Sequence, residues 1–121
     1  MAVHVDRETF ERIAEEALES LPPELLDRIS NVEIAVEDVP DADAARLGRG
    51  LLGLYRGIPL TQRAEAYWGV LPDRITLYQR NIEREARSID DLRELIRTTV
   101  IHEVAHHFGI DDDRLDELGW A

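Results

Sequence analysis

The chain of 121 residues contains no cysteine. Disulfide bonds and thiolate metal sites are therefore excluded, so that a metal could take only nitrogen and oxygen ligands. Lysine is also absent, and all 14 basic residues are arginine, which we attribute to coding bias in a GC-rich genome. No apolar run approaches the ~20 residues of a membrane span, and residues 1–10 lack the apolar core of a secretory signal. We expect a soluble cytoplasmic protein that does not engage membranes.

Positive charge is scarce relative to negative charge, and the formal net charge is −12 at pH 7. Binding to phosphate backbones needs a cationic surface, so the composition argues against a nucleic-acid partner. The hydrophobic fraction of 44% and the charged fraction of 33% are near globular values. We expect residues 1–121 to form a single domain with a real core, and a monomer by default.

Helical periodicity predicts two long helices. The first covers residues 6–21, with Asp6 as its N-cap, and the second covers residues 88–108, with Ser88 as its N-cap. A shorter helical turn is expected within residues 24–29.

Alternation of apolar and polar residues predicts three strands, at residues 31–39, 51–56 and 74–79. The acidic, glycine-containing stretch 40–50 is expected to be an exposed loop. Residues 61–68 are compatible with either a short helix or a loop. Helices and strands in this order indicate an α+β fold.

The most informative residues lie late in the second long helix, in the stretch His102-Glu103-Val104-Ala105-His106. Residues four apart stack on one face of a helix, so both histidines can bind one divalent ion while Glu103 stands beside them. Glu103 would accept a proton from an activated water and pass it to the leaving amine. The structural alternative is a pair of half-buried histidines bonded to carboxylates, next to an ordinary exposed glutamate.

Two histidines are too few for a hydrolytic zinc site, which normally has three protein ligands and a water. Gly109 can end the helix and turn the chain back toward the ion, and this makes Asp112 our choice for the third ligand. Asp112 could equally serve as a cap for a last short helix over residues 111–118. The other acidic candidates follow in the same stretch: Asp111, Asp113, Asp116 and Glu117.

The chain resembles the small bacterial zincin-like metallopeptidases, a family of single-domain proteins. The resemblance is carried by residues 51–61, 71–78 and 99–120, of which the last segment is the most specific. It implies a compact, minimal zincin-like fold, in which a small mixed β-sheet packs against the active-site helix, with further helices toward both termini.

The same resemblance implies a zinc cofactor with three ligands and a catalytic glutamate at the positions of the motif HExxHxxGxxD: His102, His106, Asp112 and Glu103. Larger metzincins carry histidine at the position of Asp112 and a methionine-containing turn beneath the metal. Here Met1 is the only methionine, so another apolar group, Leu118 or Trp120, is expected to pack beneath the metal.

Zincins bind extended peptide along an edge strand beside the active-site helix, and similarity assigns this part to residues 51–56 or 74–79. His107 projects about 100° from His106 and is expected at the surface or beside the site. His4 is expected to be a plain tail residue. Packing is the expected role of three tyrosines that could also donate to a developing oxyanion: Tyr55, Tyr67 and Tyr78.

The predicted function is zinc-dependent hydrolysis of peptide bonds in a peptide or protein substrate, within an open and shallow cleft. One alternative is a zinc-stabilised binding or scaffold protein without turnover. Another is a metal-dependent ribonuclease on the same scaffold, against which the acidic composition and the intact Glu103 argue.

Overall fold

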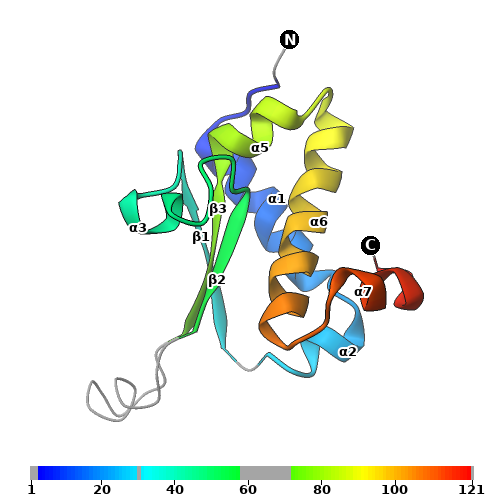
Figure 1. Cartoon of the computed structure of the whole chain (residues 1–121). Helices are drawn as coiled ribbons and strands as arrows, with labels where there is room; N and C mark the ends of the chain where they lie inside the picture. The colour runs from blue at the N-terminus through cyan, green and yellow to red at the C-terminus, as the bar shows by residue number, and fades with distance from the viewer. Residues whose placement is uncertain (1–2, 30, 58–71, 121) are drawn as a thin grey trace.

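The computed structural model describes residues 3–29, 31–57 and 72–120 (Figure 1). These residues form six α-helices and three strands, which confirms the α+β class. In chain order the elements are α1 (Arg7–Glu19), α2 (Pro23–Leu26), β1 (Val32–Glu37), α3 (Ala42–Ala45), β2 (Gly53–Arg56), β3 (Asp73–Tyr78), α5 (Gln79–Glu85), α6 (Ile89–His107) and α7 (Asp112–Leu118). The undecided stretch 61–68 lies outside the described residues.

The three strands form one mixed sheet in the order β1-β3-β2. β1 runs parallel to β3 and places Ile34 opposite Ile75, whereas β2 runs antiparallel and places Tyr55 opposite Ile75. Because β3 pairs on both sides, it is the central strand. Among the described strands, residues 51–56 contain β2 at an edge of the sheet, whereas residues 74–79, the other segment expected to bind a peptide, contain the central β3.

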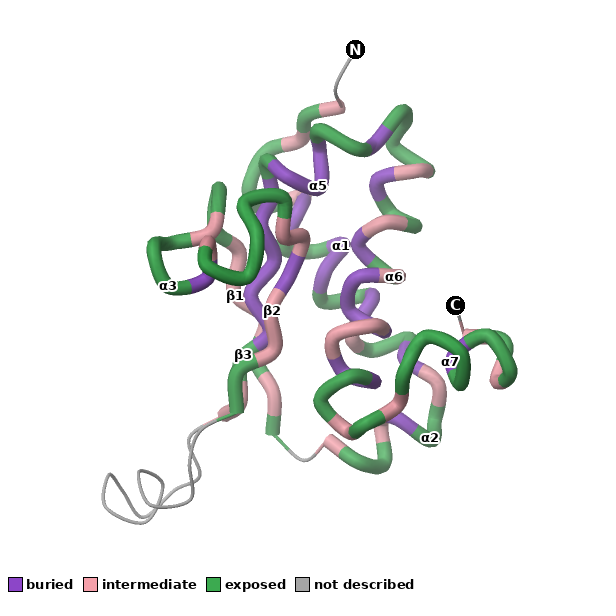
Figure 2. The backbone as a smooth tube through the Cα atoms, viewed as in Figure 1, coloured by how far each residue is buried: buried purple, intermediate pink, exposed green. Residues whose placement is uncertain are grey.

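The helices α1 and α6 pack against each other on one face of the sheet (Figure 1). Their apolar faces meet β1, β2 and β3, and the buried positions of all these elements form one core (Figure 2). The large, fully buried side chains of this core are Phe10, Leu25, Ile75, Leu77, Ile82, Leu92, Ile96, Ile101 and Leu115. Of the described helices, none combines the length and the apolar character needed to cross a bilayer.

The predicted helix signals are present in the structure. The Asp6 carboxylate accepts a hydrogen bond from the Thr9 N–H, and the Ser88 hydroxyl accepts one from the Asp91 N–H, so both residues are N-caps. Gly109 follows the end of α6 with φ +80°, a left-handed conformation that glycine adopts without strain.

Two local expectations were wrong. The expected loop 40–50 contains the short helix α3, because the Asp41 carboxylate accepts a hydrogen bond from the Ala44 N–H and the next residues include strong helix formers. Gln79, expected to end the third strand, instead begins α5, which was not predicted. Its amide donates to the Val5 carbonyl, a contact that spans the chain and leaves no local signal.

Candidate metal centre

The C-terminal half of α6 lies beside the edge strand β2 (Figure 1). The close approach depends on Gly53, where an added Cβ would lie 2.8 Å from the Thr99 Cγ2 atom of α6. Further along, Glu103 lies next to the backbone of Tyr55. The sheet therefore borders the helix along the turns that carry the predicted site.

His102 and His106 share one face of α6, as the helical spacing predicts, and their ring centroids are 5.8 Å apart. The Nε2 atom of His102 is buried and has no hydrogen-bond partner within the described part of the chain. Buried polar atoms almost always have a partner, so this exception is typical of a group that binds a ligand. The His102 ring is thus suited to donate a nitrogen lone pair to an ion.

Asp112 lies against His106, with 2.9 Å between its Oδ1 and the histidine Nε2. The N-cap of α7 is Asp111, whose carboxylate accepts a hydrogen bond from the Arg114 N–H. Another acidic candidate, Glu117, is paired with Arg114. The turn at Gly109 therefore returns Asp112 to the histidine face, while its neighbour serves as the cap.

The three candidate ligands do not form a closed metal site. Among the residues that the structure describes, no three histidine or acidic side chains are arranged as a group that could hold a metal ion. The imidazole of His106 and the carboxylate of Asp112 bind each other, and their side chains are 45% and 73% exposed. Two imidazole nitrogens and one carboxylate oxygen are nonetheless a donor set that zinc accepts.

Glu103 is half-buried next to the histidines, and its Oε1 accepts a hydrogen bond of 3.1 Å from the Tyr55 N–H. Burial raises the pKa of the Glu103 carboxyl, and the Tyr55 hydrogen bond and the charge of His106 offset this only in part. A carboxylate with a raised pKa is a stronger proton acceptor near neutral pH. The environment of Glu103 thus suits a general base.

A family model described as "zincin-like metallopeptidase" matches residues 29–120. The chain belongs to this family. The matched region extends from just before β1 through α7, so it includes all four candidate site residues, whereas α1 and α2 precede it. No curated protein sequence matches the chain.

Sequence reasoning missed two contacts of the Tyr55 side chain. The Tyr55 ring stacks on His107, with ring centroids 3.9 Å apart, and the Tyr55 hydroxyl donates to Asp73 Oδ2 at 2.8 Å. His107 is exposed and beside the site, as expected. Glu103 and His107 are four residues apart and therefore share one face of α6, so the sequence could have predicted that both would contact the same strand.

The remaining candidates make no contact with the histidine pair that the described residues show, or lie outside those residues. Tyr78 is buried in the core at 1% exposure, in agreement with a packing role, and Tyr67 lies outside the described residues. Leu118 and Trp120 line a pocket with α2, and their place beneath a metal stays a prediction. His4 is more than a tail residue, because its Nδ1 lies 3.1 Å from a carboxylate oxygen of the buried Glu83.

Proposed function

We propose that this zincin-like protein is a zinc-dependent peptidase. The observation that carries the proposal is the buried, unpartnered Nε2 of His102, one turn from His106 and its carboxylate neighbour Asp112. These three side chains would hold the ion once His106 and Asp112 exchange their mutual hydrogen bond for a shared metal. Zinc, when bound, would lower the pKa of a water toward ~7 and polarise a substrate carbonyl.

Glu103 would be the general base of the reaction. Its partly buried carboxylate would take a proton at Oε1 or Oε2 and later deliver that proton to the leaving amine. The Tyr55 N–H orients the carboxylate through Oε1 and leaves Oε2 without a protein donor among the described residues. That second oxygen is the one we assign to proton transfer.

The substrate would be an extended peptide bound along β2. This strand pairs only with β3 among the described strands, and its outer edge presents the Tyr55 N–H toward Glu103. An extended chain adds to a free strand edge through backbone hydrogen bonds, which gives affinity with little dependence on sequence. A peptide bound along this edge would bring its scissile bond next to Glu103, whose Oε1 is held by the Tyr55 N–H and whose Oε2 faces the reaction.

Zinc content, measured by elemental mass spectrometry on tag-free protein, tests the assignment of the ligands. We expect about one zinc per chain in the wild type and a sharp reduction in Asp112→Ala, because a hydrolytic site needs three protein ligands. Asp113→Ala is the matched control, since this exposed neighbour belongs to the same helix turn. Absence of zinc from the wild type, or equal losses in both variants, would contradict the proposal.

A second candidate function is a binding protein in which zinc only stabilises the fold. The hydrogen bond between Glu103 and the Tyr55 N–H favours it, because this bond ties α6 to β2 and gives Glu103 a structural role. Removal of zinc by a chelator separates the two functions. A large fall in melting temperature, in a protein that cleaves no peptide when zinc-loaded, would support the binding protein.

A further inference from the structure

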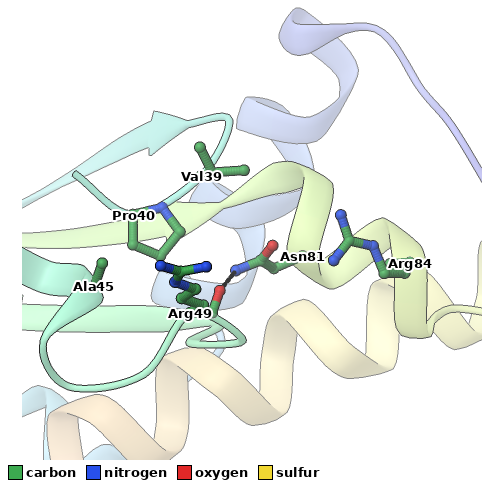
Figure 3. Close-up of a pocket in the computed structure, with 6 residues that line it drawn as sticks. All are labelled: Val39, Pro40, Ala45, Arg49, Asn81 and Arg84. Carbon is green, nitrogen blue, oxygen red and sulfur yellow. Dashed lines mark hydrogen bonds between the residues drawn. The ribbon is translucent and has the colours of Figure 1, made fainter. Parts of the chain in front are cut away.

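A cavity with a mostly apolar lining lies between α3 and α5, and no histidine is among the residues that line it. It has a volume of about 280 Å³ and is bordered by the turn after β1, by α3, by the segment before β2 and by α5. Figure 3 shows its six lining residues: Val39, Pro40, Ala45, Arg49, Asn81 and Arg84. A cavity of this size suits one amino-acid residue better than a cofactor.

Two guanidinium groups border this cavity without an acidic partner. Arg49 and Arg84 are exposed, and neither has an ion pair or side-chain hydrogen bond within the described residues. Two acidic side chains of the neighbouring segments are engaged elsewhere, because Asp38 pairs with Arg7 and Asp41 caps α3. In a chain of net charge −12, two such unpaired cations at one cavity form a local site for an anion.

Asn81 gives the cavity an oriented hydrogen-bond acceptor. This residue is only 4% exposed, and its Nδ2 donates to the carbonyls of Arg49, at 2.9 Å, and Leu51, at 2.8 Å. These two bonds fix the amide orientation, because only the nitrogen can donate to carbonyls. The Asn81 Oδ1 then lines the cavity with no partner among the described residues, turned away from the Arg49 carbonyl (Figure 3).

The third element of the cavity is an apolar wall. Val39, Pro40 and Ala45 form it, and Val39 stays 47% exposed, which is unusual for a large hydrophobic side chain in this chain. Burial of such a surface by a ligand would be favourable by the hydrophobic effect. A simple inorganic anion would leave the apolar wall exposed and would make no use of the Asn81 Oδ1 acceptor.

We propose that this cavity binds the carboxy-terminal residue of a peptide whose last side chain is apolar. Such a residue carries on one α-carbon a carboxylate for Arg49 and Arg84, an amide N–H for the Asn81 Oδ1, and a side chain for the apolar wall. Asn81 also holds the segment that leads into β2, so the cavity is joined to the strand that borders the histidine site. The inference does not depend on the proposed hydrolysis.

The test is a titration of the ¹⁵N-labelled full chain with N-acetyl-glycyl-leucine, followed by NMR, with mass spectrometry to show that the peptide stays intact. We expect saturable shifts of the backbone amides of Val39, Ala45 and Asn81. The same peptide with an amidated C-terminus should bind about tenfold more weakly or not at all, because it lacks the charge that the arginines bind.

Two exposed arginine substitutions and one matched control locate the binding site. Arg49→Gln and Arg84→Gln should each weaken binding about tenfold, while Arg12→Gln, an exposed arginine of α1, should leave it unchanged. Val39→Asp places a competing carboxylate on the wall and should also weaken binding without disturbing the core.

Four results would overturn this inference. The first two are the absence of a saturable shift with the free acid and an equal affinity for the amidated peptide. The other two are an equal loss of peptide affinity in Arg12→Gln and reversal of the peptide-induced shifts by inorganic phosphate at the concentration of the peptide. None of these results bears on zinc content or on the role of Glu103. The failure of this inference is therefore distinguishable from a failure of the proposed function.

Discussion

Glu83 on α5 and Glu103 on α6 are both withdrawn from bulk water, yet their surroundings differ. The Glu83 side chain is 7% exposed and accepts hydrogen bonds from three groups, the N–H of Val5, the amide of Gln79 and the ring of His4. Burial alone would raise the pKa of Glu83, but these hydrogen bonds outweigh it and hold the pKa below its usual value. Glu83 is therefore stable as a charged group.

Among the described residues, Glu103 receives one hydrogen bond, from the Tyr55 N–H, and burial raises its pKa. The comparison shows that the number of donors decides whether a withdrawn carboxylate is stabilised, and that burial by itself does not. A carboxylate with several donors ties segments of the fold together. One with few donors keeps its basicity, at some cost to the stability of the fold, and this is typical of functional sites.

The largest expected effect is on catalysis. Glu103→Gln should lower the hydrolysis of an unstructured protein substrate by about 10²–10⁴-fold, which is the usual contribution of a general base. Glu83→Gln should leave the rate per folded, zinc-loaded molecule unchanged. Rates are compared after zinc content has been measured for each protein. Full activity in Glu103→Gln would contradict the role of Glu103 as the general base.

The next effect is on stability. Glu83→Gln should lower the free energy of unfolding by about 2 kcal/mol, because it removes charge-assisted bonds and can turn an NH₂ group toward the Val5 N–H. Urea denaturation at pH 7 measures this change in the free energy of unfolding. Glu85→Gln, at an exposed position of the same helix, is the control. A similar loss in the control would show that helix propensity, and not the hydrogen bonds, causes the effect.

Glu103→Gln should have a smaller effect on stability, of the opposite sign. The glutamine oxygen can still accept from the Tyr55 N–H, and the substitution removes a charge that burial disfavours. We expect metal-free Glu103→Gln to be as stable as the wild type, or more stable by less than about 1 kcal/mol. A loss as large as that of Glu83→Gln would instead make Glu103 a structural tie, as in the binding protein.

The smallest effect is on the pH dependence of these differences. The folded pKa of Glu83 is lowered, so its contribution is fully present above the unfolded value of about 4.3 and is lost as the pH falls through the folded value. The folded pKa of Glu103 is raised, so its charge destabilises the fold at neutral pH, and this penalty disappears as the pH falls below the unfolded value. Urea midpoints between pH 7 and pH 3 should therefore bring both variants closer to the wild type, from opposite directions. Differences that stay constant with pH would contradict these assignments.

Local patterns predicted the two long helices, three strands and the face of α6 that carries His102 and His106. The same reasoning failed at α3 and at Gln79. For α3, the loop composition of residues 40–50 hid a capping aspartate followed by alanines. For Gln79, continued strand alternation concealed the start of a helix whose first side chain contacts Val5, 74 residues earlier.

The third-ligand question shows where local information ends. Both Asp111 and Asp112 suit the start of a helix, so the sequence left cap and ligand open for Asp112. The structure places Asp111 at the cap and Asp112 against His106. Whether Asp111 or Asp112 becomes the cap depends on a shift of one residue in the start of α7, which the turn of the chain after Gly109 determines.

By itself, the sequence determined the features that lie within a few helix turns: the spacing of His102, Glu103 and His106, the caps at Asp6 and Ser88, and the stop at Gly109. These depend on the geometry of one helix and on the conformational freedom of glycine. Only the tertiary structure decided that, among the described residues, β2 is an edge strand beside α6, Glu103 has one hydrogen-bond donor and Glu83 has three, and Arg49 and Arg84 border the same cavity as Asn81. Most of those features depend on contacts between residues far apart in the chain, such as Asn81 with Leu51, 30 positions apart, and Glu83 with His4, 79 positions apart, and such contacts exist only after the helices have packed on the sheet.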